Sequence, residues 1–195
     1  MFTHMGHFME DRRQSILDAG LAILREDGLA GFTQPKVAAR AGLRQGNLTY
    51  YFPTRTDMLA AVARNAIDIQ LAVAKKMVDG VSSVTQAIAV IAANIVRHEN
   101  TRVLVALNQA ADKEPALSLL FNELTEGFIA ELGNLMSKLG LPADRSHIDL
   151  IHALFVGLSV IDLATTRPQG EARATDALAN AFEMLSTTQR RFEEK

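Results

Sequence analysis

The sequence predicts an all-α protein, with an N-terminal module of three helices followed by about six mostly longer ones. Apolar residues recur at helical spacing through most of the 195 residues, and no stretch of useful length alternates apolar and polar residues as a half-buried strand would. Capping residues, glycines and prolines divide the chain at regular intervals. Cysteine is absent, which excludes disulfides, thiolate metal sites and a cysteine nucleophile.

The first helix is expected from about Asp11 to Asp27, because its apolar stripe ends at Gly28. A short helix should follow Thr33, a good N-cap, and a second short helix should occupy residues 44–52. The later helices are expected at residues 54–79, 83–99, 102–111, 115–139, 146–165 and 172–192, several of them opened by capping boxes. The boundary between two domains is expected at Pro53, which gives residues 1–53 and 54–195.

The residues that follow Gln34 fit a helix-turn-helix, with Ala38 four, Gly42 eight and Leu48 fourteen residues further on. Ala38 is small enough to let two helices approach closely, and Gly42 can adopt the positive φ of a tight turn. Leu48 would anchor the second helix to the first. In such a motif the second helix enters the major groove of DNA.

The outward face of this second helix has the chemistry of a DNA-reading surface. If Leu48 and Phe52 point inward, Gly46 and Tyr50 point outward, with amides and hydroxyls beside them that can contact base edges and phosphates. The predicted DNA-binding residues are Thr33, Gln34, Lys36, Arg44, Gln45, Gly46, Asn47, Thr49, Tyr50, Tyr51 and Arg55. Spacing alone leaves another interpretation open, since short helices around a glycine turn also serve packing in other all-α proteins.

Five segments strengthen the DNA-binding interpretation: residues 16–20 (ILDAG), 31–33 (GFT), 37–43 (VAARAGL), 46–48 (GNL) and 50–55 (YYFPTR). Through them, residues 12–60 resemble the N-terminal domain of the TetR family of transcriptional regulators. The resemblance implies a homodimer on a palindromic operator and an inducer site in the C-terminal helices. Arg44, Asn47, Thr49 and Tyr51 differ from the residues usual in the family, and they fall on the face expected to read the operator.

The resemblance also implies that the last two helices pair with those of a second subunit. Residues 148–164 are apolar almost all round, and Ala153, Gly157 and Ala164 would allow close helix approach. Ala177, Leu178, Ala181, Phe182 and Leu185 form a stripe on the last helix. The alternative is a single large monomeric core.

Several polar and aromatic residues of the C-terminal helices are candidates for a small-molecule site, because buried polar groups need partners. The candidate ligand-binding residues are Asn94, His98, Asn108, Phe121, Phe128, His152, Phe155 and Asp162. Individually, the polar ones could instead serve a dimer interface or a satisfied core. His152, Ser159 and Asp162 do not indicate a hydrolase, because side chains from one helix lie parallel and do not converge in a relay.

The sequence therefore predicts a ligand-responsive DNA-binding transcriptional regulator, a repressor released by a small-molecule inducer, and not an enzyme. A protein-interaction module that binds neither DNA nor a ligand is a second alternative. No cofactor or metal is expected. The net charge is −2, with +2 in residues 1–56 and −4 in the rest, which allows a modestly basic N-terminal module. Without a signal peptide or an uninterrupted apolar run of about 18 residues, a cytoplasmic protein that does not enter the membrane is expected.

Overall fold

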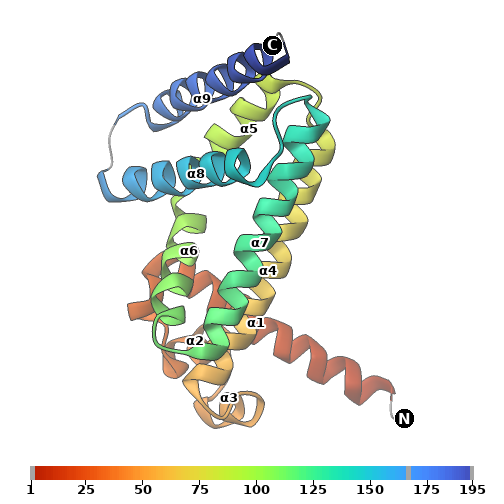
Figure 1. Cartoon of the computed structure of the whole chain (residues 1–195). Helices are drawn as coiled ribbons and strands as arrows, with labels where there is room; N and C mark the ends of the chain where they lie inside the picture. The colour runs from red at the N-terminus through yellow and green to blue at the C-terminus, as the bar shows by residue number, and fades with distance from the viewer. Residues whose placement is uncertain (1–2, 166–167, 194–195) are drawn as a thin grey trace. The chain divides into compact units, whose positions relative to one another are not determined.

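The computed structural model describes residues 3–165 and 168–193, with side chains from 9 to 187 within those ranges, and all of its regular structure is helical. The helices are α1 (Thr3–Gly31), α2 (Gln34–Arg40), α3 (Gln45–Tyr51), α4 (Arg55–Gly80), α5 (Val84–Ile95), α6 (His98–Ala111), α7 (Pro115–Lys138), α8 (Arg145–Thr165) and α9 (Gly170–Glu193) (Figure 1). Within the described residues the predicted all-α class and the count of nine helices are therefore confirmed.

The helix-turn-helix forms at the predicted place. Thr33 caps α2 by accepting a hydrogen bond from the Lys36 N–H at 3.4 Å. Gly42 has φ +68°, as the turn between α2 and α3 requires. Leu48 is fully buried and Phe52 is 5% exposed, so both anchor α3 as predicted. A seven-residue helix is marginal by itself, and these contacts hold it in place.

Several predicted helix boundaries differ from those of the structure. α1 begins at Thr3, and Gly28 interrupts it with the positive φ (66°, with ψ −162°) expected of a C′ glycine, so that residues 29–31 follow as a separate short helical turn. α5 ends at Ile95 and α6 begins at His98, because a tight turn intervenes in which the Arg97 N–H donates to the Asn94 carbonyl. α8 begins at Arg145 and not at residue 146.

The chain divides into two compact units. Unit 1 comprises the described residues up to Ile69 together with Arg102–Asn122, and unit 2 comprises Gln70–Thr101 and the described residues from Glu123 onward. Helices α4, α6 and α7 each contribute to both units. The unit defined by packing contacts, unit 1, is thus larger than the predicted domain of residues 1–53. The functional division at Pro53 stays a prediction.

Unit 1 fixes the helix-turn-helix on a small apolar core. Its largest fully buried side chains are Ile16, Leu24, Phe32, Leu48, Met58, Ile67 and Leu117. Gly20 marks a close approach of α1 and α4, because a Cβ there would lie 2.6 Å from Val62 Cγ2. A larger residue would push these two helices apart.

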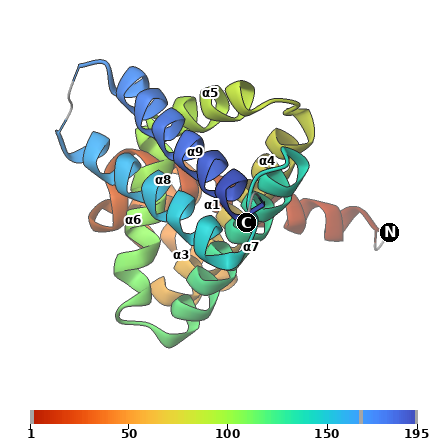
Figure 2. The same ribbon diagram turned by 45° about the horizontal axis from the view of Figure 1, so that its top comes forward.

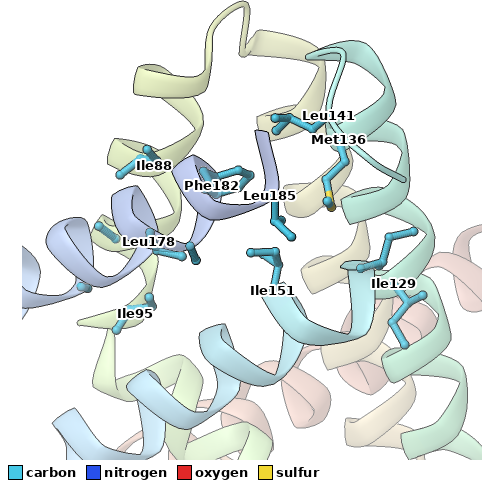
Figure 3. Packing of buried hydrophobic residues seen from close by; sticks show 13 residues of the cluster. Ile88, Ile95, Ile129, Met136, Leu141, Ile151, Leu178, Phe182 and Leu185 are labelled. Carbon is cyan, nitrogen blue, oxygen red and sulfur yellow. The ribbon is translucent and has the colours of Figure 1, made fainter. Parts of the chain in front are cut away.

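Unit 2 is built around contacts of α9 with α5 and α8 (Figure 2). Ile88 and Ile95 of α5, Ile151 of α8 and Leu178, Phe182 and Leu185 of α9 belong to one buried cluster (Figure 3). The predicted apolar stripe on α9 is therefore used mainly inside the protomer, against α5. It is not left free to pair with a second subunit.

Candidate nucleic-acid interface

α3 presents a polar face that the rest of unit 1 leaves uncovered. Tyr50 is 73% exposed, and Gln45, Gly46 and Asn47 are also exposed. Tyr51 is half-buried and packs edge-on against Tyr50, with ring centroids 5.4 Å apart. Gly46 and Tyr50 thus point outward as predicted. The arrangement leaves an amide-bearing and aromatic surface available for contacts to a partner.

Thr49 contributes less to this face than the sequence suggested. Its side chain is half-buried, and its hydroxyl donates a hydrogen bond of 2.9 Å to the Gly46 carbonyl of the same helix. Such back-bonding satisfies the hydroxyl proton locally. A contact of Thr49 with DNA would therefore use its methyl group or the oxygen lone pairs.

The start of α2 carries Gln34 and Lys36, which have different roles. The Gln34 side-chain amide donates to the Phe52 carbonyl at 3.1 Å, so it joins the beginning of α2 to the end of α3. Lys36 is exposed and pairs with Asp27 at 3.2 Å. A surface ion pair of this kind is weak and exchanges readily. Lys36 thus stays available to a phosphate, whereas Gln34 acts within the fold.

The two arginines predicted to flank α3 differ as well. Arg44 is the N-cap residue of α3 and its side chain is exposed. Arg55 donates from Nε to the Phe32 carbonyl at 2.8 Å and from Nη2 to the Leu29 carbonyl at 3.3 Å, and it stacks over the Phe32 ring. Arg55 therefore ties the start of α4 to the end of α1. Its predicted phosphate contact would have to use its remaining amino group.

Arg40 is a basic residue of α2 that is already neutralised. It forms a bidentate pair with Glu26 of α1, which lowers the pKa of Glu26 and raises the pKa of Arg40 through the hydrogen bonds between them. Together with Lys36–Asp27, this pair joins α1 to α2.

Arg13 of α1 is a residue near α3 that the sequence analysis missed. Its guanidinium carbon lies 5.7 Å from the centre of the Phe52 ring, at the C-terminal end of α3, and the residue is exposed. Its position in the first helix, 39 residues before Phe52, gave no local signal of this contact.

In unit 2, two of the candidate ligand-binding residues lie together. Asp162 of α8 is 7% exposed, and its carboxylate meets His98 Nε2 of α6 at 2.8 Å. Arg173 of α9, which the sequence analysis did not single out, donates to the other carboxylate oxygen at 3.0 Å. The result is a buried carboxylate held by two cationic or hydrogen-bonding side chains, which joins the starts of α6 and α9 to α8.

The remaining candidates are dispersed. The Asn94 amide donates to the Val90 carbonyl at 2.9 Å and is satisfied inside α5. Asn108 is exposed and belongs to unit 1, and its part in a small-molecule site stays a prediction. His152 is half-buried, and burial is the main cause that lowers its pKa. Ser159 donates to the Phe155 carbonyl of its own helix at 2.8 Å.

The three candidate phenylalanines are all half-buried and divide between the units. Phe121 lies in unit 1, while Phe128 and Phe155 lie in unit 2. Phe155 packs against the buried cluster of unit 2. Within the described residues no group of three or more histidine and acidic side chains is arranged to hold a metal ion.

α8 carries an exposed apolar stripe. Leu150 and Ile161 are 53% and 49% exposed, and Ala153 and Ala164 follow the same three- and four-residue spacing. A Cβ at Gly157, in the middle of the stripe, would meet nothing within 4 Å. The helix is long and apolar enough to cross a membrane, a test that core helices of other proteins also pass. An uninterrupted apolar run does not reveal this property in the sequence, because His152, Ser159 and Asp162 interrupt the helix.

A helix-turn-helix whose second helix, α3, is exposed, in a chain whose described residues form only helices, is typical of DNA-binding proteins. Residues 16–62 match the sequence model of the family "Bacterial regulatory proteins, tetR family". These residues are similar to the DNA-binding domain of the TetR family, and the described part of the chain shares its fold with solved regulators of that family.

Three similar proteins illustrate the likeness. The HTH-type transcriptional regulator RutR of Escherichia coli (strain K12) is 36% identical over 61 residues, which cover 31% of this chain and 29% of RutR. The structure of the multidrug binding protein EbrR complexed with imidazole is 26% identical, covers 88% of this chain and 94% of EbrR, and has a TM-score of 0.64. A transcriptional regulator from Saccharomonospora viridis, solved in complex with choline, is 13% identical, covers 89% and 96%, and has a TM-score of 0.77. The match to the curated relative thus spans less than a third of its length.

Proposed function

We propose that this protein is a transcriptional repressor that binds a palindromic operator as a homodimer and leaves it when a small-molecule inducer binds. The observation that carries the proposal is the exposed face of α3. Tyr50, Asn47 and Gln45 project from a short helix that Leu48 and Phe52 fix to unit 1. In a dimer, two such helices about 34 Å apart would enter successive major grooves of one DNA face.

The exposed stripe of α8 supports the dimer. Leu150 and Ile161 would lose water-exposed apolar surface against a second copy, and Gly157 would let the two helices approach closely. The stripe consists of leucine, isoleucine, alanine and glycine. Such an apolar surface suits a permanent interface better than a transient one. We therefore assign the stripe to a self-complementary contact between α8 helices.

Leu150→Glu tests this assignment, and Leu119→Glu is the matched control. Both leucines are exposed, at 53% and 72%, but Leu119 lies on α7 outside the stripe. Light scattering at micromolar concentration is expected to give a dimer for the unchanged protein and for Leu119→Glu, and a monomer for Leu150→Glu. A monomeric unchanged protein would refute the dimer.

For the inducer, unit 2 offers the carboxylate of Asp162 with His98 and Arg173 around it. Two proteins of the same fold were solved with choline and with imidazole, which are small nitrogen-containing ligands. We propose small organic cations as the first inducer class to screen, because a cation can replace His98 at the carboxylate. Such a ligand would change DNA affinity only if it binds the conformation that does not bind DNA more tightly than the one that does. Helices α4 and α6 contribute to both units and would carry the effect.

The experiment that tests DNA binding is a gel-shift assay with the DNA upstream of the protein's own gene. Tyr50→Ala is expected to weaken the shift at least tenfold, while circular dichroism and the melting temperature stay unchanged, because Tyr50 is 73% exposed. An unchanged affinity would remove Tyr50 from the recognition face. Release of the DNA by a compound from a metabolite screen would identify the inducer.

A further inference from the structure

Arg13 occupies a place that neither the helix-turn-helix motif nor the family match assigns. The residue lies on α1, before the matched residues 16–62 begin. Its guanidinium carbon stands 5.7 Å from the centre of the Phe52 ring. Since Phe52 is the C-cap residue of α3, Arg13 places a positive charge at the C-terminal end of the helix that we assign to the major groove.

Phe52 is a rigid support for this arginine. Its ring is buried, its N–H donates to the Leu48 carbonyl at 2.9 Å, and its carbonyl accepts from Gln34 at 3.1 Å. A guanidinium that rests on a fixed ring has fewer orientations than a free arginine. Among the described residues no hydrogen bond uses the N–H donors of Arg13, so they remain available to an acceptor.

The charge of Arg13 is also uncompensated. Among the described residues it forms no ion pair, whereas Lys36 and Arg40 in the same unit pair with Asp27 and Glu26. Arg55, the other arginine expected at this end of α3, uses two of its nitrogens for the carbonyls of Leu29 and Phe32. Arg13 is therefore the more available cation at this end.

At the opposite end of α3, Arg44 is the exposed N-cap residue. A helix of seven residues is about 10 Å long, and the major groove is about 12 Å wide. An arginine at each end of such a helix would place a cation where the phosphates that flank the groove can be contacted.

We propose that Arg13 is a phosphate-binding residue of the DNA interface, positioned by the Phe52 ring, and that it takes the part that the sequence assigned to Arg55. The inference rests on the proposed DNA-binding function. It adds the first helix to the interface and states that its contribution is independent of base sequence.

The test measures binding to a fluorescein-labelled 30-bp duplex of arbitrary sequence by anisotropy, from 50 to 200 mM salt. The proteins are the unchanged chain, Arg13→Gln, Arg13→Lys and Lys76→Gln. Lys76 is an exposed lysine of α4 in unit 2, so its variant changes the net charge by the same amount outside the proposed interface.

Arg13→Gln is expected to weaken binding several-fold at 100 mM salt and to lower the slope of log K against log salt by about 0.9 for each lost contact. Arg13→Lys should keep the slope but bind less tightly, because an ammonium group cannot stack on Phe52 as a guanidinium does. Lys76→Gln should match the unchanged protein. All four proteins should melt within about one degree of one another, since Arg13 and Lys76 are exposed.

The outcomes separate this inference from the proposed function. If the unchanged protein binds no duplex at any salt concentration, both fail. If it binds and Tyr50→Ala weakens binding to a selected site, while Arg13→Gln leaves the slope and affinity unchanged, only the Arg13 inference fails. Equal loss of affinity at every salt concentration, together with a lower melting temperature of Arg13→Gln, would show a structural role and overturn the inference.

Discussion

Gly46 provides a direct test of how closely α3 approaches DNA. It lies in the first turn of α3, and a Cβ at this position would meet nothing within 4 Å. The protein's own packing therefore gives no reason for glycine here. Glycine costs a helix interior about 0.5–1 kcal/mol relative to alanine, and somewhat less in the first turn. Gly46→Ala is thus expected to stabilise the protein by about 0.5 kcal/mol, or about 1–2 °C in melting temperature for a chain of this size.

DNA affinity should change in the opposite direction. If the backbone at Gly46 approaches the duplex closely, the added methyl group displaces α3 from the DNA. Both subunits of a dimer would carry this change, so the Gly46→Ala protein should bind DNA less tightly. We expect a roughly threefold or larger loss of operator affinity, which corresponds to about 0.7 kcal/mol. The comparison uses differential scanning calorimetry and fluorescence anisotropy on the same samples.

Gly80→Ala is the matched control for Gly46→Ala. Gly80 ends α4, and a Cβ there also meets nothing within 4 Å. It should leave operator affinity unchanged. The reasoning is refuted if Gly46→Ala binds the operator as well as the unchanged protein does, because α3 would then not approach DNA at this residue.

Two further predictions concern unit 2. Asp162→Asn should lower the free energy of unfolding by about 1–3 kcal/mol in chemical denaturation, because it weakens the contacts with His98 and Arg173. The partial exposure of these two partners limits the loss. An unchanged free energy of unfolding would mean that this cluster does not hold α6 and α9 to α8. The pKa of His152 is lowered, mainly by burial, so the unfolded chain takes up a proton near pH 6.5 while the folded chain takes it up only at lower pH. Stability should therefore fall as the pH drops below about 6.5, and melting curves of His152→Gln should show a smaller fall; equal falls would exclude His152 as the cause.

Helix α3 could be predicted from the sequence because its signals are local. Leu48 and Phe52 are four residues apart and therefore share one face of a helix, which leaves Tyr50 on the opposite face. The capping box of Thr54 and Asp57 was equally local, and both of its hydrogen bonds form, at 3.0 and 3.1 Å. Short-range spacing is enough to predict these features, although the buried Leu48 and Phe52 are needed to hold the short helix in place.

The roles of the polar side chains could not be predicted in the same way. Gln34 and Arg55 were expected to face DNA, but their donors meet carbonyls 18 and 23 residues away in the chain. Nothing in the neighbouring residues indicates which long-range acceptor a flexible side chain will find. The same reason explains why Arg13 was missed.

The sequence by itself determined the helical class, the helix-turn-helix and the outward face of α3, because each depends on periodicity and capping within a few residues. Only the tertiary structure decided that the α9 stripe packs on α5, that the apolar stripe of α8 stays exposed, and that Asp162 meets His98 from 64 residues away. An amphipathic pattern says which face of a helix needs cover, but the element that covers it depends on the packing of the whole chain.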